Sequence, residues 1–222
     1  LSNGDTAQAA VGSKLNTLVS EAESKLKGIL DYFGVVDGKN VRLYRVADAD
    51  VELLRKAGVS EDDIKHCLAV AAKALEIAHR TGAALDFELI GRGALFHDLG
   101  KSKTHAIEHG RLGAEMGKSL GLPAAITDIM EKHIRGGLTE AEATELGLPV
   151  KDYRLKSIEE KIVIYADRLV DIITDGVVKI DEEAEQRFEE ILTTQIKYGK
   201  NDITLKRYLG YHREIQALAG NS

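Results

Sequence analysis

The chain has 222 residues, of which 44% are hydrophobic and 30% are charged, so it can bury a core, and wholesale disorder is excluded. Its formal net charge of −6 argues against a general electrostatic affinity for nucleic acid, although a bound metal ion can still attract a small anion. Charged residues interrupt the apolar runs well short of the ~20 residues that a membrane span needs, so no membrane association is expected.

Cysteine content and the start of the chain bear on the compartment. Cys67 is the only cysteine, so no internal disulfide can form and a reducing compartment, the cytoplasm, is expected. The first dozen residues lack the basic start and the apolar stretch of a signal peptide, which fits the same expectation.

Residues 1–58 are predicted to form an extension that precedes a helical core. Apolar side chains recur at helical spacing over residues 14–33, which predicts an amphipathic helix. Asp37-Gly38 lies between short alternating apolar runs, a pattern typical of a small β-hairpin. The amphipathic helix offers a surface for a homodimer or for packing on its own domain, and the sequence leaves both open.

From about Asp48 onward the chain is predicted to be helical. Helices are expected over residues 61–81, 86–99, 107–120, 123–135, 139–145, 158–174, 182–198 and 202–218. The predicted helix starts carry capping boxes, at Ser60 with Asp63, Thr139 with Glu142 and Ser157 with Glu160. Glycines mark predicted helix ends, at Gly82, Gly100, Gly121 and Gly136-Gly137. The interpretation is an all-α fold with a core over residues 59–178 and a C-terminal helical extension over 179–222.

Six residues carry candidate metal-binding chemistry and lie at or within the predicted helices: His66, His97, Asp98, His109, His133 and Asp167. Imidazole and carboxylate groups together suit Fe, Mn, Co, Ni or Zn. Any one of these histidines alone would more often be a core or surface residue, but their number and placement favour a metal site. Asp167 lies in an apolar stretch, where a buried carboxylate needs a positive partner. A surface position for Asp167 fits equally well, because the charged residues Arg168 and Asp171 lie on part of the same helix face.

The stretch Ala94-Leu-Phe-His-Asp-Leu-Gly-Lys101 resembles the signature of the HD superfamily of metal-dependent phosphohydrolases. The order of His66, His97-Asp98 and Asp167 is similar to the ligand pattern of that family. The segment that begins at His109, followed by His133 after the next helix, resembles members with two additional histidines. The resemblance spans about half of the chain and implies an HD-domain helical bundle.

The resemblance also implies a ligand set. His66, His97, Asp98 and Asp167 would hold a first divalent ion, and His109 and His133 a second, with Asp98 bridging; one or two ions are therefore expected. Two ions ~3.5–4 Å apart can clamp a phosphoryl oxygen and lower the pKa of a bridging water, which gives a hydroxide nucleophile.

Two cations complete the candidate site. Asp98 and Lys101 are assigned the catalytic role, and Lys101 would contact the substrate phosphate or the Asp98 carboxylate; the alternative is a solvated lysine near a helix C-terminus. Arg135 is either a second phosphate contact with a bidentate fork or an exposed arginine near a glycine turn.

The leading hypothesis is hydrolysis of a small phosphoester, a nucleotide monophosphate or a cyclic phosphodiester, so the partner is a phosphorylated metabolite or nucleotide. A di-iron oxygenase is an alternative, because members with the same six ligands activate O₂. A non-catalytic metal-binding signalling module is a third reading. Lys101 and Arg135 favour phosphate chemistry. The chain lacks the Gly-Tyr-Pro signature of cyclic-di-GMP hydrolases, which argues against that activity.

Overall fold

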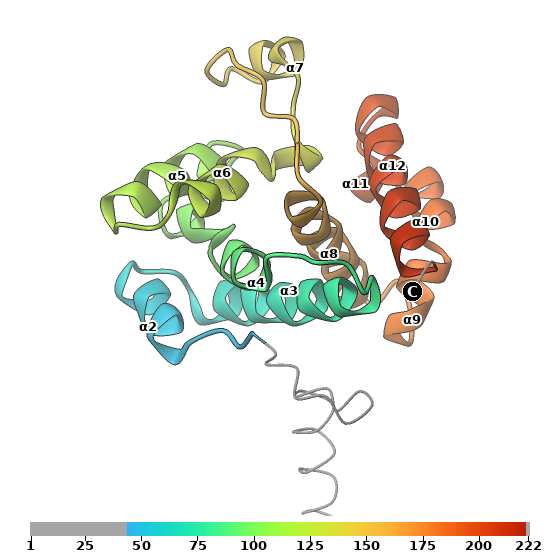
Figure 1. The fold of residues 1–222 in the computed structure, drawn as a ribbon. Helices are drawn as coiled ribbons and strands as arrows, with labels where there is room; N and C mark the ends of the chain where they lie inside the picture. The colour runs from blue at the N-terminus through green and yellow to red at the C-terminus, as the bar shows by residue number, and fades with distance from the viewer. Residues whose placement is uncertain (1–43, 221–222) are drawn as a thin grey trace, which may run out of the picture. The chain divides into compact units, whose positions relative to one another are not determined.

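The structure, a computed structural model, describes residues 44–220 (Figure 1). Every regular element within these residues is a helix, which confirms the all-α prediction. The helix predicted over 14–33 and the hairpin predicted around Asp37-Gly38 lie outside the described residues. Across the described part of the chain, no helix has the length and apolar character that crossing a membrane requires. The division of the chain into three segments stays a prediction.

The helices follow one another along the chain with short connections. In order they are α2 (Asp48–Lys56), α3 (Glu61–Arg80), α4 (Phe87–Phe96), the 3-10 helix η1 (Leu99–Ser102), α5 (His109–Ser119), α6 (Ala124–Lys132), the 3-10 helix η2 (Ile134–Gly136), α7 (Glu140–Glu145), α8 (Ile158–Thr174), α9 (Asp181–Gln186), α10 (Phe188–Thr194), α11 (Ile196–Gly199) and α12 (Asp202–Ala219).

Helices α3, α4 and α8 lie together at the centre of the described fold (Figure 1). One face of α3 presents small side chains, including Val70, Ala74 and Ala78, to the interior. Helix α8 is buried around most of its circumference, as expected for a helix that is apolar on nearly every side. Because small side chains let two helices approach closely, this packing brings His66 of α3 next to Asp167 of α8.

A second apolar cluster joins α2, α4, α5 and α6, with Phe96 and Met130 among its fully buried side chains. Gly93 of α4 faces α6, and a Cβ there would lie 2.5 Å from the Ile129 Cδ1. This close approach sets the end of α4, which carries His97, against the end of α6, which carries His133. The two imidazole rings lie 5.2 Å apart between centroids.

Several helix boundaries follow the predicted caps. Thr139 and Ser157 form the expected capping boxes at the starts of α7 and α8. Ser60 caps α3 by accepting from the Asp63 amide, but the Asp63 carboxylate accepts from the Ser60 hydroxyl and does not complete a box. The helix predicted over 86–99 ends earlier, at Phe96, so that the ligand pair lies in the turn that follows it.

The helix predicted over 182–198 is wrong in its continuity, because the structure divides it into α9, α10 and α11. The chain departs from helical geometry at Arg187 (φ −103°, ψ 12°) and at Gln195 (φ −116°, ψ 102°). The breaks let Phe188 and Tyr198 both enter the main apolar cluster beside α8. Tertiary packing therefore outweighs the helical propensity of this segment.

Candidate metal centre

The six predicted ligands come together at one place in the described structure. α3 carries His66, the turn after α4 carries His97 and Asp98, α5 begins with His109, α6 ends at His133, and α8 carries Asp167. His66 Nε2 lies 3.1 Å from Asp167 Oδ1, although 101 residues separate the two in sequence. The Asp167 side chain is 14% exposed, so of the two positions that the sequence left open it takes the interior one.

Asp98 lies between two groups of ligands, and each of its carboxylate oxygens faces one group. Oδ2 is 3.1 Å from His97 Nε2 and 3.7 Å from His66 Nε2. Oδ1 is 3.2 Å from His109 Nε2 and 3.4 Å from His133 Nε2. Atoms that share one ion at bond lengths of ~2.0–2.1 Å can lie at most ~4.2 Å apart. All four distances from Asp98 meet this limit, so the arrangement suits two ions, one on each side of Asp98.

Three of the histidines are oriented by the same backbone contact. Nδ1 of His97, His109 and His133 donates to the carbonyl three residues earlier, at 2.7 Å in each case. This fixes the tautomer and directs the Nε2 lone pair toward Asp98. His97 Nε2 is buried and lacks a hydrogen-bond partner among the described residues. The Nε2 atoms of His109 and His133 face each other at 2.8 Å. Divalent cations would satisfy these lone pairs, so the residues fit a metal site.

The charges at the centre are strongly coupled. Burial opposes ionisation of Asp98 and Asp167, yet the neighbouring imidazoles hold the pKa of both carboxyl groups well below the usual value. Burial also opposes protonation of His97, but Asp98 and Asp167 raise the pKa of its imidazole well above the usual value. At His133 burial dominates and lowers the pKa. Two ionised carboxylates buried together therefore require positive charge at this place.

Gly100 has a different role from the one predicted. It was expected to end a helix, but its φ is not positive and it lies inside η1, so that prediction is wrong. A Cβ at this position would meet the backbone of α5, 1.9 Å from the His109 carbonyl oxygen and 2.7 Å from Gly113 N. The glycine is needed because η1 touches α5 directly, and this contact places His109 beside Asp98.

The two predicted phosphate contacts take different positions. Lys101 Nζ lies 2.5 Å from Asp98 Oδ2, and its side chain is 23% exposed, so it belongs to the centre and can still be reached from solvent. Arg135 lies in η2, two residues after His133, and is partly exposed. Its backbone is left-handed, with φ 51° and ψ 28°.

Asp171 is a third carboxylate at the centre, although the sequence indicated it only as a neighbour of Asp167. Ligand atoms of His66, Asp167 and Asp171 all lie within 4.8 Å of one another. Burial and the charge of Asp167 raise the pKa of Asp171 to about 6. The available signal was the spacing, because residues four apart on a helix share a face.

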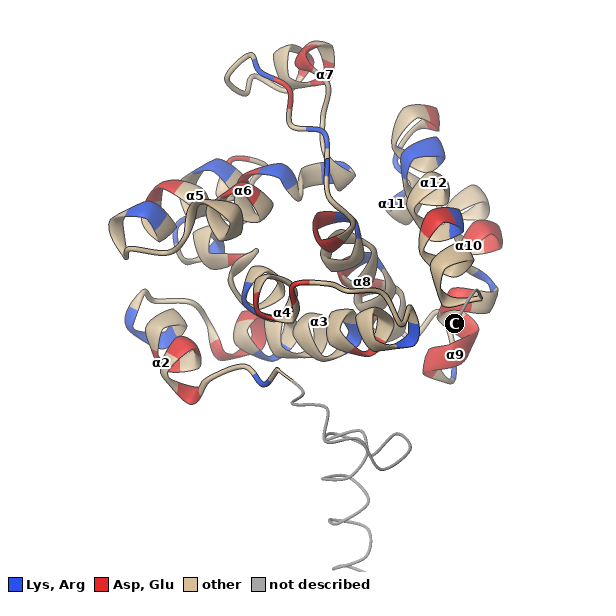
Figure 2. Ribbon diagram, viewed as in Figure 1, with Lys and Arg blue, Asp and Glu red and all other residues tan. Residues whose placement is uncertain are grey.

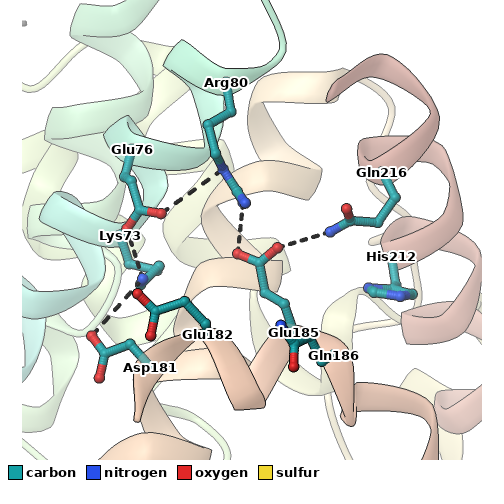
Figure 3. Close-up of a pocket in the computed structure, with 9 residues that line it drawn as sticks. All are labelled: Lys73, Glu76, Arg80, Asp181, Glu182, Glu185, Gln186, His212 and Gln216. Atoms are coloured by element: carbon teal, nitrogen blue, oxygen red, sulfur yellow. Dashed lines mark hydrogen bonds and ion pairs between the residues drawn. The ribbon is translucent and has the colours of Figure 1, made fainter. Parts of the chain in front are cut away.

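A separate pocket of about 540 Å³ lies beside α3, α9 and α12 (Figure 3). It is lined by Lys73, Glu76, Arg80, Asp181, Glu182, Glu185, Gln186, His212 and Gln216. Its charged groups pair with one another, as in the contact of Arg80 Nη2 with Glu185 Oε1 at 2.6 Å. Acidic residues also cover much of α9 (Figure 2). Carboxylates outnumber cations in this pocket and it contains no predicted ligand, so it is a poor site for phosphate.

Comparison with known proteins extends these observations. The chain is 43% identical over 162 residues to the uncharacterised protein MJ0778 of Methanocaldococcus jannaschii, which covers 72% of this chain and 90% of that protein. It is 37% identical over 150 residues to a tRNA (cytidine(56)-2′-O)-methyltransferase of Picrophilus torridus. That match covers 68% of this chain but 43% of the relative, so the chain spans less than half of that enzyme.

The fold is shared with the HD domain of the L. monocytogenes phosphodiesterase PgpH, solved in complex with cyclic-di-AMP. The TM-score is 0.52 at 18% sequence identity, over 76% of this chain and 96% of that domain. Residues 63–170 match the HD domain family in sequence, and all six predicted ligands lie within this range. With this match and the shared helical fold, the chain belongs to the HD-domain family.

Proposed function

We propose that this protein hydrolyses a small phosphoester with one or two divalent metal ions held by the six clustered residues. The observation that carries the proposal is the position of Asp98, whose two carboxylate oxygens face two separate groups of imidazole nitrogens. A carboxylate between two groups of ligands would allow two ions to act together on one phosphoryl group.

The donor set fits divalent transition metals, because four imidazoles and two carboxylates suit Fe, Mn, Co, Ni or Zn. Ions bound there would acidify a water molecule and neutralise phosphoryl charge. Residues of the chain itself would bind the substrate. Lys101 pairs with Asp98 at 2.5 Å, and the exposed part of its side chain could bind a phosphate oxygen. Arg135 offers a planar fork for a further phosphate contact.

The proposed substrates are nucleotide monophosphates and cyclic phosphodiesters. Supporting this class, the PgpH domain of the same fold was solved with a cyclic dinucleotide. The chain carries a formal charge of −6, which favours a small substrate over a nucleic acid chain bound along the protein surface.

The test is metal analysis of anaerobically purified protein, followed by phosphate release from a panel of phosphoesters with each metal restored. We expect bound transition metal and turnover without O₂. His66→Ala should lose metal and activity together, whereas His79→Ala, which changes a histidine at the far end of α3 stacked on Phe87, should keep both.

Each alternative gives a different result. Turnover that requires O₂ and iron would replace the hydrolase with the oxygenase that the same ligands allow. Protein that binds no metal and releases no phosphate would leave a signalling module as the better reading.

A further inference from the structure

Arg135 and Lys200 share an unusual backbone conformation. Among the described residues other than glycine, these two have positive φ, 51° and 61° respectively. That region is unfavourable for residues with a Cβ, and such residues gather at functional sites. Both residues are cations, and they lie 65 positions apart in the chain, so local sequence does not link them.

Lys200 occupies a tight turn between α11 and α12. Asn201 N donates to Gly199 O at 2.8 Å, which closes a three-residue γ-turn with Lys200 at its centre. A Cβ on Gly199 would lie 2.3 Å from Leu192 O, so this side of the turn is packed against α10. On the other side, the Asn201 side chain accepts from Thr204 N at 2.8 Å and caps α12. The backbone that carries Lys200 is therefore held from both directions.

Arg135 is fixed by the same helix. Arg207 of α12 donates from Nη1 to the Arg135 carbonyl oxygen at 3.0 Å. Tyr211, one turn further along α12, donates to the Gly136 carbonyl oxygen at 2.9 Å. Helix α12 thus anchors the backbone at Arg135 and begins directly after the turn that presents Lys200.

Arg168 provides a third positive charge behind this pair. It is 8% exposed, and its Nε is buried without a hydrogen-bond partner among the described residues. Its Nη1 donates to Asp171 Oδ2 at 3.2 Å, and its Nη2 to the Tyr208 hydroxyl at 3.2 Å. Because Asp171 groups with the ligands His66 and Asp167, Arg168 connects the metal centre to the cationic turn.

Arg168 pairs with Asp171, whereas Arg135 and Lys200 have no carboxylate partner among the described residues. Lys200 is exposed as a residue, yet partial burial of its ammonium group, followed by the charges of Arg168 and Arg135, lowers its pKa. Within residues 44–220, no carboxylate lies within ion-pair distance of the Arg135 guanidinium or the Lys200 ammonium. Two cations without carboxylate partners, on backbone that α12 anchors at one site and follows directly at the other, favour an anion between them.

We propose that Arg135 and Lys200, with Arg168 behind them, bind a second phosphate group of the substrate, beside the phosphoryl group that reacts at the metal centre. This inference rests on the proposed function and narrows it to small molecules that carry two separate phosphate groups. Lys200 lies outside residues 63–170, which match the HD domain family, so the subsite depends on the C-terminal helices of this chain.

The experiment compares two probes that differ by one phosphate, adenosine 3′,5′-bisphosphate and AMP, on the metal-loaded full chain. Lys200→Ala should lower kcat/KM for the bisphosphate by about tenfold or more, mainly through KM, because one charged hydrogen bond to phosphate is lost. The same variant should leave kcat/KM for AMP within about twofold of the wild type. Lys200→Arg should restore most of the loss. Lys206→Ala, which removes an exposed lysine of α12, is the matched control and should change neither probe.

The outcomes distinguish a failure of the proposed subsite from a failure of the proposed hydrolase function. If Lys200→Ala lowers kcat/KM equally for both probes, or for neither, the subsite is refuted. Phosphate release from the probes would still support the hydrolase. If the protein releases phosphate from neither probe, the dissociation constants of both probes are measured by calorimetry on the same metal-loaded protein. A Lys200→Ala defect confined to the bisphosphate would then support the subsite although the hydrolase proposal had failed. Unchanged binding would refute the subsite.

Discussion

His109 and His133 hold their Nε2 atoms 2.8 Å apart while each Nδ1 donates to a backbone carbonyl. Neither ring can rotate without losing its carbonyl contact, so two lone pairs converge beside the Oδ1 atom of Asp98. Whether the centre holds one ion or two therefore depends on this pair of histidines.

The first prediction concerns ion number. Wild-type protein should bind two divalent ions per chain, and His109→Ala should bind one, because His66 and His97 still face both Asp98 Oδ2 and Asp167. Inductively coupled plasma mass spectrometry on protein dialysed against trace metal gives the ratio. A wild-type ratio of one that His109→Ala does not lower would contradict the assignment.

The second prediction concerns stability upon metal removal. An ion present at about 100 times its Kd stabilises the folded state by about 2.7 kcal/mol, so chelation should lower the Tm by several degrees. Asp98→Ala removes the carboxylate shared by both ligand groups, and its Tm should not respond to chelator. Thermal unfolding followed by circular dichroism, with metal restored as the control, makes the measurement. Identical melting of wild-type protein with and without chelator would rule this out.

The third prediction concerns Gly100. Gly100→Ala places a Cβ 1.9 Å from the His109 carbonyl oxygen, so η1 and α5 must separate. We expect a loss of about 3 kcal/mol or more in the free energy of unfolding, together with loss of the ion held by His109. Gly210→Ala is the matched control, because a Cβ there has no neighbour within 4 Å and the residue lies inside α12. That variant should gain about 0.5–1 kcal/mol. Urea denaturation of both variants decides the point.

The fourth prediction concerns pH and Glu142. Burial opposes its ionisation, but the Thr139 amide and Arg207 hold its pKa below the usual value. A carboxyl group whose pKa is lower in the folded state stabilises the fold above its unfolded pKa of about 4.3, and that stabilisation is lost as pH falls through the folded value. Glu142→Gln should therefore cost about 1–3 kcal/mol at pH 7.

The difference between Glu142→Gln and wild-type protein should shrink as pH falls below about 4.3, because the wild-type carboxyl group then becomes neutral as well. Urea denaturation at a series of pH values gives both curves. Glu145→Gln, an exposed position on the same helix, serves as control and should follow the wild type. A Glu142→Gln defect that stayed constant down to pH 3 would show that charge is not its origin.

The ligand types and their order could be predicted from the sequence, because the His97-Asp98 motif and the histidines and aspartate around it resemble the pattern of the HD superfamily. The structure brings those residues together, and their roles stay proposals. That each oxygen of Asp98 faces a different group of imidazoles depends on the angle between helices, which sequence spacing does not encode. Gly100 was misassigned for a related reason, since its neighbour across the contact, Gly113 N, belongs to another helix.

The C-terminal segment was harder to predict from the sequence. Residues 182–198 have helical composition, and their breaks arise only because buried side chains must reach α8. The turn at Lys200 depends on the packing of Gly199 against Leu192 O, a contact with no local sequence signature. Positive φ at a lysine is uncommon and cannot be read from the residue type.

The 101 residues between His66 and Asp167 give the centre one more property. The entropy of closing a loop grows only with the logarithm of its length, and doubling the length adds about 0.6 kcal/mol. A few extra residues in the exposed stretch 149–151 between α7 and α8 would therefore change the closure entropy very little. Metal affinity and the length of that connection are therefore nearly independent, and the segment that carries α7, which projects from the helical body in Figure 1, can be lengthened there while the predicted ligands keep their places.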